Sequence, residues 1–309
     1  MIHGNLTSFF DKPVQDFLKA GDVPDFSNVA VRLRCSYDEE HTLQTLLSDL
    51  LTQPGIENLE ALIFGVWMDG GEAVDVTPDP AIELLVSQKE KLPNLKALFV
   101  GDTISEENEI SWIEQGNMSP LWAAFPGLKQ FRARGGNGLK LGKIIHNSLE
   151  SLIIETGGMD RNTVHEVLEA QAPLSHLELW LGDENYGGST ALSNFEVLLD
   201  GEVLPELKSL YLNNSIYEDD LAIALSNSVI VDRLDTLGLS MGALTDKGGQ
   251  ALLDSEKLTH LKKLDLTFHY LSDDVGKALS SKYSNVILDD VQKPDTWGGN
   301  EHHYIAVSE

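Results

Sequence analysis

Histidine and carboxylate side chains are the residues of this chain whose types could support metal binding or acid–base catalysis. His176 and Glu178 stand two residues apart in a strand-like segment, and Glu155 lies in a similar segment upstream. Because residues two apart in a strand share a face, the three would meet if neighbouring strands pair. Such a trio could hold a metal ion or transfer a proton. A histidine beside carboxylates on a sheet is more often a plain hydrogen-bonded pair, so we predict no catalytic residue and no metal ligand.

Acidic side chains gather after another strand-like segment, at Asp102, Glu106, Glu107 and Glu109. This acidic loop could bind a cation or a basic peptide. The alternative is a solvated run of charge that precedes the next helix. Trp112 and Trp122, which follow the loop, are expected in the core.

The sequence contains neither the HExxH motif of zinc proteases nor the CxxC motif of redox and metal sites. The glycine-rich stretch 135–138 is not followed by the Lys-Ser or Lys-Thr of a phosphate-binding loop. His302 and His303 are either a loose metal-binding tail or residues without a role. We therefore predict no cofactor. Cys35 is the only cysteine, so no disulfide can form within the chain.

A pattern of three apolar residues recurs along the chain, in which the second residue follows the first by three positions and the third follows the second by two. The eight copies are Leu59-Leu62-Phe64, Leu95-Leu98-Val100, Leu128-Phe131-Ala133, Leu149-Leu152-Ile154, Leu174-Leu177-Leu179, Leu207-Leu210-Leu212, Leu234-Leu237-Leu239 and Leu261-Leu264-Leu266. Val29, Val31 and Leu33 form a divergent first copy, and residues 286–288 a worn last one. The second and third residues of each copy point to one face of a strand.

Helix-period stretches separate these triplets, at residues 40–51, 80–92, 163–170, 219–227 and 246–253. One strand and one helix cannot bury their apolar faces alone, but stacked repeats share a continuous core. The sequence therefore predicts an α/β leucine-rich-repeat solenoid, a horseshoe with a concave parallel β-sheet and convex helices. We expect a single domain over 1–309, with an N-terminal cap at 1–25, nine to ten repeats at 26–290, and a tail or closing strand at 291–309.

Two repeats resemble a known subtype. The run Leu244 to Gly248 before Ala251-Leu252-Leu253 is similar to a ribonuclease-inhibitor-like repeat, and residues 271–279 repeat it. This resemblance implies a full helix in each repeat. The family's usual asparagine or cysteine, three residues after the third leucine, is missing. That position holds Trp67, Thr103, Gly136, Gly157, Gly182, Ser215, Gly242 and His269, of which the glycines would permit a left-handed turn.

The charge balance restricts the partners. With 22 Lys and Arg against 49 Asp and Glu, the formal net charge is −27, which repels nucleic acids and anionic membranes. The same charge favours a partner with a basic surface, although acidity is also a common route to solubility. The sequence contains no apolar run of membrane-spanning length and begins without a secretory signal, so we expect a cytoplasmic protein.

Several stretches are more specific than a generic repeat. They are 101–102 with 106–113, 155–158, 178–182 with 186–188, and the ending 304–309. Together they resemble an uncharacterised bacterial leucine-rich-repeat family over the whole length. The resemblance implies the fold and a bacterial origin, and it carries no activity and no catalytic residues.

Side chains flanking the inward leucines should line the concave face. The candidate binding residues on this face are Phe99, Arg132, Arg134, Glu155, His176, Glu178, Trp180, Tyr211 and Asn213. Aromatic residues and arginine dominate interface energetics, which favours a recognition surface. The alternative is that Arg132 and Arg134 pair with Glu155 and Glu178 across strands. We therefore predict a non-enzymatic scaffold for a protein or peptide, with a metal-assisted or acid–base enzyme at the centre of the face as the alternative.

Overall fold

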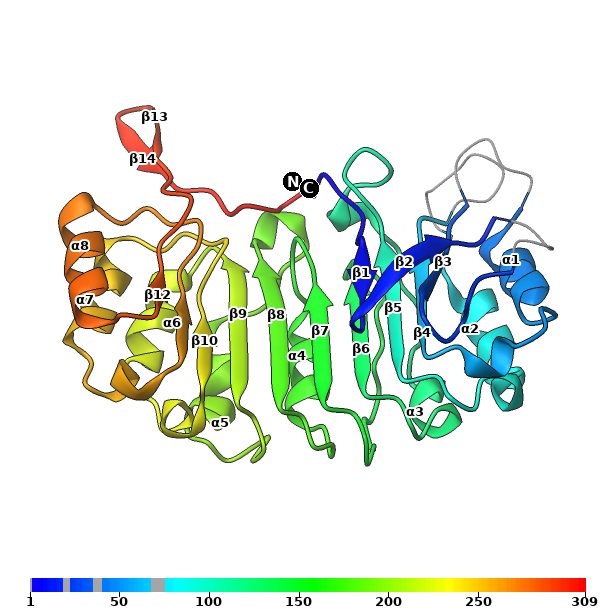
Figure 1. Cartoon of the computed structure of the whole chain (residues 1–309). Coiled ribbons are helices and arrows are strands. Elements are labelled where there is room, and N and C mark those ends of the chain that lie inside the picture. Colours follow the sequence, from blue (N-terminus) through cyan, green and yellow to red (C-terminus); the bar gives the residue numbers. More distant parts are fainter. Residues whose placement is uncertain (1, 19–22, 36–40, 68–75) are drawn as a thin grey trace. The chain divides into compact units, whose positions relative to one another are not determined.

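The computed structural model describes residues 2–18, 23–35, 41–67 and 76–309 (Figure 1). Residues 1 and 19–22 of the expected cap, and Glu40 of the expected helix at 40–51, lie outside the described residues. The chain divides into two compact units. Unit 1 comprises 1–155, 170–172 and Glu309, and unit 2 comprises 156–169 and 173–308. Each unit is described by itself, and the single domain over 1–309 stays a prediction.

Unit 1 contains a sheet whose strands follow one another in chain order. The strands are β1 Ser8–Phe9, β2 Lys12–Asp16, β3 Ala30–Leu33, β4 Ala61–Gly65, β5 Ala97–Asp102, β6 Gln130–Arg134 and β7 Ser151–Glu155. β1 and β2 form an antiparallel hairpin, and every later strand pairs in parallel with the one before it. The helices are α1 Leu43–Leu50, η1 Ile56–Asn58, α2 Asp79–Ser87, η2 Lys89–Lys91, η3 Ile110–Trp112 and α3 Pro120–Ala124.

Unit 2 also contains parallel strands in chain order, two of seven residues followed by three shorter ones. The strands are β8 His176–Gly182, β9 Ser209–Ser215, β10 Thr236–Gly238, β11 Lys263–Asp265 and β12 Val286–Ile287, all parallel, followed by the antiparallel hairpin β13 Asp295–Trp297 and β14 Asn300–His302. The helices are α4 Arg161–Leu168, η4 Glu184–Tyr186, η5 Leu192–Phe195, α5 Glu196–Leu199, α6 Glu218–Leu225, η6 Ile230–Arg233, α7 Asp246–Asp254, η7 Lys257–His260 and α8 Asp273–Lys282.

The apolar triplets set the register of both sheets. In unit 1 the second residue of each triplet pairs with its equivalent in the next strand, from Leu62 through Leu98 to Phe131. In unit 2 the same holds from Leu210 through Leu237 to Leu264. These side chains are at most 1% exposed. The prediction of a mixed α/β structure with parallel strands in chain order is therefore confirmed.

Several of the described helices start at a capping side chain. Thr42, Asp160 and Thr245 accept backbone N–H groups at the starts of α1, α4 and α7. Such caps stabilise a helix by about 1 kcal/mol each. None of the described helices is both long and apolar enough to cross a bilayer.

The left-handed turns differ from the prediction. Of the four glycines expected to adopt them, only Gly182 has a positive φ, of 72°. In the later repeats the left-handed residue comes one position earlier and is not glycine, at Asn214, Met241 and Phe268. The left-handed turns of these repeats therefore do not use the glycines that would permit them, because the backbone hydrogen bonds of the stacked turns impose a conformation that side chains alone would disfavour.

A buried carboxyl group stands at the start of α6. Glu218 is wholly buried, and neither of its carboxylate oxygens has a hydrogen-bond partner of good geometry within the described chain. Burial raises the pKa of Glu218 well above 4.5, and the charge of Asp219 raises it further, while the nearby N–H groups of Leu244 and Gly242 lower it only in part. The carboxyl group is therefore protonated over a wider pH range in the folded chain than in the unfolded chain.

Glu218→Gln is expected to stabilise the protein at neutral and alkaline pH. A raised folded pKa means that the folded state binds the extra proton, so wild-type stability falls as pH rises from about 4.5 towards the folded pKa. The glutamine variant should match wild type near pH 4 and exceed it at pH 8 by about 1–3 kcal/mol, the cost of a buried group without a partner. Thermal unfolding at both pH values measures this. The exposed Glu196→Gln is the control, and a pH-independent difference for Glu218→Gln would contradict the assignment.

Candidate functional site

The two faces of the parallel strands differ between the units. In unit 1 every residue of β4 and β5 is buried, so both faces of these strands are covered. In unit 2 burial alternates along the first residues of β8 and β9, with one face buried and the other partly exposed. The residues predicted to line a concave face therefore have different surroundings in the two units.

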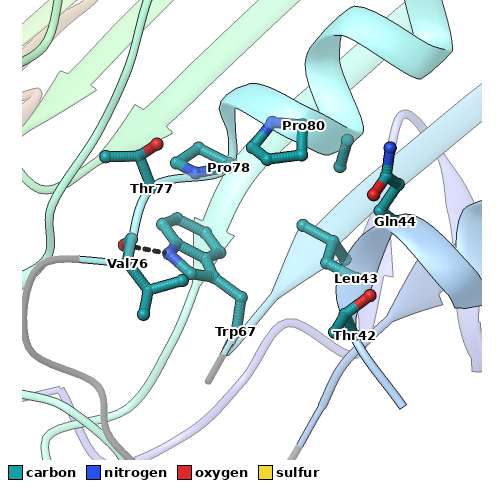
Figure 2. Close-up of a pocket in the computed structure, with 9 residues that line it drawn as sticks. Thr42, Leu43, Gln44, Trp67, Val76, Thr77, Pro78 and Pro80 are labelled. Atoms are coloured by element: carbon teal, nitrogen blue, oxygen red, sulfur yellow. Dashed lines mark hydrogen bonds between the residues drawn. The ribbon is translucent and has the colours of Figure 1, made fainter. Parts of the chain in front are cut away.

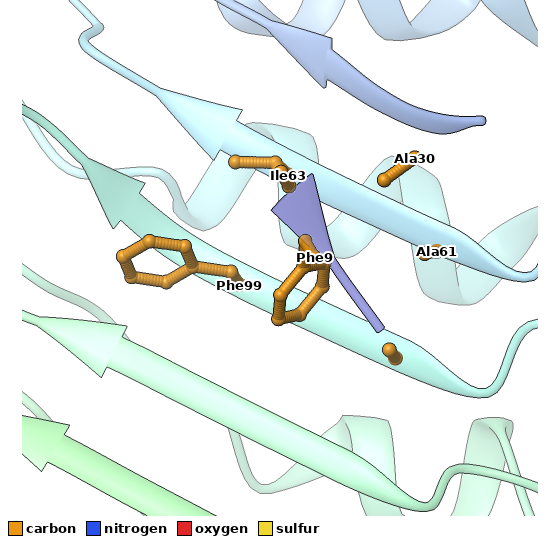
Figure 3. Packing of buried hydrophobic residues seen from close by; sticks show 6 residues of the cluster. Phe9, Ala30, Ala61, Ile63 and Phe99 are labelled. Atoms are coloured by element: carbon orange, nitrogen blue, oxygen red, sulfur yellow. The ribbon is translucent and has the colours of Figure 1, made fainter. Parts of the chain in front are cut away.

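Phe99 of β5 is covered by the chain's own N-terminal residues. Phe9 of β1 packs against it with ring centroids 6.1 Å apart, in a cluster that includes Ala61, Ile63 and Ala97 (Figure 3). Phe99 is 0% exposed. It does not offer a binding surface, and the prediction that it does was wrong.

Arg134 and Glu155 form a buried ion pair beneath the same segment. Arg134 Nε lies 2.6 Å from Glu155 Oε2, and its Nη1 lies 3.8 Å from Asp102 Oδ1. Arg132 also contacts Glu155 and stacks over Phe99 at 4.5 Å from the ring centroid. Although burial raises the pKa of Glu155, the charges of Arg132 and Arg134 outweigh it and hold that pKa below 4.5. The sequence left open whether Arg132 and Arg134 form a recognition surface or pair with carboxylates across strands. The structure shows that both arginines pair with Glu155.

Asp102, predicted as part of an acidic loop, belongs to this buried cluster. Arg32 Nη1 of β3 donates to Asp102 Oδ2 at 2.8 Å, and its Nε donates to Asp16 at 2.6 Å. The N-terminal segment closes over the cluster, because the backbone N–H of Leu6 donates to Asp102 at 3.2 Å and Asn5 Nδ2 donates to the Asp102 carbonyl at 2.8 Å. Asp102 is 1% exposed and is not available to a cation or a peptide.

Two more carboxylates of the acidic loop, Glu106 and Glu107, also have partners within unit 1. Glu107 contacts Arg34 and accepts the N–H of Ile104, and Glu106 lies 3.3 Å from His3. Glu109 precedes η3, where its side chain makes no capping hydrogen bond. In the described part of the chain, no group of three or more His, Cys, Asp and Glu side chains is arranged to hold a metal ion.

The two tryptophans after the acidic loop differ in burial. Trp122 is buried at 4% and donates to the carbonyl of Leu141, as predicted for a core residue. Trp112 is 59% exposed, so its prediction as core was wrong. The glycine-rich stretch 135–138 has a packing role, because a Cβ on Gly135 would lie 2.6 Å from Ile113.

A small cavity lies beside Trp67 in unit 1 (Figure 2). Leu43, Pro78 and Pro80 line it, and Trp67 Nε1 donates to the carbonyl of Val76 at 3.0 Å. Its volume of about 160 Å³ is below the roughly 300 Å³ of an ordinary small-molecule site. We do not place the function there.

The residues predicted for the concave face in unit 2 are neighbours, of which Trp180 and Asn213 are buried at 8% and 3% exposure. Trp180 Nε1 donates to Glu178 Oε1 at 2.7 Å, and Asn213 Nδ2 donates to the same oxygen at 3.4 Å. Asn213 in turn accepts the backbone N–H of Ser240 at 3.2 Å. The side chain of Glu178 is 22% exposed, so this carboxylate is oriented by two donors and still reaches solvent.

His176 and Tyr211 are neighbours on this surface. Their rings lie 5.8 Å apart, and His176 Nδ1 is 2.9 Å from Ser209 Oγ. Burial lowers the pKa of His176, so the imidazole is neutral at pH 7. Its 3.8 Å approach to Glu178 is therefore not an ion pair at that pH.

Lys263 and Asp265 of β11, which were not among the candidate binding residues, extend the surface. Lys263 Nζ donates to Tyr211 Oη at 3.0 Å and lies 2.9 Å from Asp265. The ring of Tyr211 lies across Gly238 of β10, where a Cβ would come within 1.9 Å of the ring. Gly238 is the sequence feature that could have indicated this contact. Because it has no side chain, Tyr211 of β9 can reach across β10 to Lys263 of β11.

The enzymatic trio of Glu155, His176 and Glu178 is not supported. Glu155 is wholly buried between two arginines of unit 1, so it can act neither as a metal ligand nor as a proton acceptor for substrate. Only His176 and Glu178 share a described surface.

Together these features define a mixed α/β protein with parallel strands in chain order and one partly exposed polar and aromatic sheet face in unit 2. No family model and no curated protein matches the sequence. A crystal structure of a Bacteroides fragilis protein, a structural-genomics target, is similar at 31% identity and a TM-score of 0.79, covering 86% of this chain and 76% of that one. The chain belongs to the same family as this bacterial protein, whose description states no activity.

A second solved structure is much less similar. An internalin from Listeria monocytogenes aligns at 15% identity over 91% of this chain and 87% of that chain, with a TM-score of 0.36. At that score the likeness carries no argument about fold or function.

Proposed function

We propose that the chain is a leucine-rich-repeat solenoid of the ribonuclease-inhibitor-like kind, and that it acts as a non-enzymatic scaffold that binds a protein or peptide. Eight apolar triplets, parallel strands in chain order and helices between most of them support the class. The binding surface is the open face of unit 2, defined here by His176, Glu178, Tyr211, Lys263 and Asp265, with Trp180 and Asn213 buried beside Glu178.

The observation that carries the proposal is the alternating burial of the unit 2 strands. Unit 1 fills the equivalent face with its own N-terminal residues, whereas Tyr211 and His176 remain partly exposed in unit 2. Tyr211 is held by Lys263 Nζ at its hydroxyl, so little side-chain freedom is lost when a partner packs on the ring. Aromatic side chains of this kind contribute most of the energy at protein interfaces.

The proposed partner carries a basic surface and is neither a nucleic acid nor a membrane. A net charge of −27 attracts a basic protein over roughly the Debye length, which is about 8 Å at physiological salt. The same negative charge repels the phosphate groups of nucleic acids and of anionic lipids. We further propose a bacterial, cytoplasmic setting, without a cofactor and without a catalytic residue. Partner binding should weaken as salt increases.

His176→Ala combined with Tyr211→Ala is expected to reduce capture of a specific partner by at least about tenfold, since truncating a central aromatic removes roughly 1.4 kcal/mol or more. Quantitative mass spectrometry of partners retained from a bacterial lysate measures this. Lys277→Ala on α8, 76% exposed, is the matched control and should retain partners as wild type does. Equal retention by the double variant and wild type would contradict the site.

A further inference from the structure

Three repeats of unit 2 end in the same turn. Asn214, Met241 and Phe268 stand 27 residues apart and have φ values of 54°, 69° and 63°. Each donates its N–H to the next repeat, as Asn214 does to the Ser240 carbonyl at 2.7 Å and Met241 to the Thr267 carbonyl at 2.8 Å. The turns therefore form a regular row at the ends of β9, β10 and β11.

Residues 304–307, which we name the C-terminal segment, cross this row (Figure 1). The sequence predicted either a closing strand or a tail for residues 291–309. Residues 304–307 form no strand, and they are ordered against the turns. Ile305 is 8% exposed and Val307 is 3% exposed, whereas the side chain of Tyr304 is left largely in solvent. Two aliphatic side chains separated by one residue thus anchor the segment.

Two side chains of the repeats hold the segment by its backbone. Tyr270 Oη accepts the N–H of Tyr304 at 2.9 Å and donates to the Tyr304 carbonyl at 2.8 Å. Asn214 Oδ1 accepts the N–H of Val307 at 3.0 Å, and its Nδ2 donates to the Val307 carbonyl. Between them, Ala306 N–H donates to the Met241 carbonyl at 2.8 Å. Backbone hydrogen bonds of this kind confer affinity for an extended peptide without regard to its sequence, and the pockets beneath it select side chains.

The connection to the segment is a separate, exposed element. Every residue of β13 is exposed, and Trp297 at its end is 66% exposed and stacks on His302 at 4.7 Å. The segment is therefore held mainly by its own contacts with the turns and by the packing of His303 on Tyr270, with ring centroids 4.7 Å apart.

We propose that the track formed by Tyr270, Met241 and Asn214 is a peptide-binding site. In this chain it is occupied by residues 304–307, and it accepts an extended partner peptide with two aliphatic side chains separated by one residue. The chain's own segment then acts as an intramolecular competitor, with the millimolar effective concentration of a short tether. This site is distinct from the open face of unit 2 and does not depend on its function.

The test uses the full chain with Ile305→Asp and Val307→Asp, which releases the segment. The probe is a fluorescein-labelled synthetic peptide with the sequence of residues 303–309, and fluorescence anisotropy measures its binding. The released variant should bind the peptide at least tenfold more tightly than wild type, and a peptide with aspartate at the two aliphatic positions should not bind. Trp297→Ala in the released variant is the matched control and should leave binding unchanged.

Substitutions in the track complete the test. Asn214→Gly, which keeps the left-handed turn available, and Tyr270→Phe, which keeps the ring, should each weaken peptide binding to the released variant about tenfold. If the double aspartate variant does not fold, Ala306→Pro releases the segment by removing the N–H that Met241 accepts and buries no charge. A folded, released variant that binds the peptide no better than wild type overturns the proposal, as does binding that both track substitutions leave unchanged.

Discussion

Replacing Arg134 with alanine is expected to lower the free energy of unfolding by about 3–5 kcal/mol, the range for breaking a buried ion pair from one side. The variant would leave Glu155 with Arg132 alone and would remove the hydrogen bond that Arg134 donates to the Thr103 carbonyl at 2.7 Å. Because Glu155 is 0% exposed, water cannot replace the lost partner. Chemical denaturation followed by circular dichroism measures the change.

The pH dependence of this loss separates an electrostatic effect from simple loss of packing. The pKa of Glu155 is lowered in the folded chain, so its contribution to stability is present above pH 4.5 and is lost as pH falls through the folded pKa. The difference between wild type and Arg134→Ala should therefore shrink below pH 4. Lys129→Ala, which breaks an exposed pair with Glu150, is the control and should cost less than about 1 kcal/mol. An equally small loss for Arg134→Ala would refute the buried network.

Phe9→Ala should destabilise unit 1 by about 3–5 kcal/mol, as truncation of a buried phenylalanine usually does. The ring fills the space over Phe99 and Ala97, and its loss would leave a cavity on the sheet face (Figure 3). It would also loosen the N-terminal segment, whose Leu6 and Asn5 bind Asp102. Denaturant unfolding gives the stability change, and hydrogen exchange at the amide of Leu6 should increase.

Trp112→Ala is the matched control for Phe9→Ala. It removes a larger aromatic ring, but that ring is 59% exposed, so the stability change should stay within about 0.5 kcal/mol. If the two variants lost the same stability, Phe9 would not be an anchor of the sheet face, and the face of unit 1 would have to be reconsidered as a binding surface.

The sheet was predictable because its cause is local and repeated. Leu98 and Phe131 sit at the same place in their triplets and pair in register, as the spacing requires. Turn geometry was less predictable, since Met241 and Phe268 take left-handed conformations that no sequence rule assigns to them. There the hydrogen bonds of adjacent repeats outweigh local preference.

The sequence does contain a signal for the covered face of unit 1. Ala61 and Ile63 of β4, with Ala97 and Phe99 of β5, are apolar on the face assigned to binding, and strands that are apolar on both faces are buried on both. In β8, by contrast, the residues on that face are His176, Glu178 and Trp180. The composition of each strand thus distinguished a covered face from an open one.

The sequence by itself determined the strands, their parallel order and their register, because buried aliphatic side chains at a constant spacing leave one way of stacking. Only the tertiary structure decided which polar residues remain available. Asp102 and Glu155 pair with Arg32, Arg132 and Arg134 in unit 1, and residues 304–307 occupy the turns of unit 2. These outcomes depend on contacts between positions 21 to 96 residues apart, where charge pairing and burial are set by neighbours in space and leave no periodic trace in the sequence.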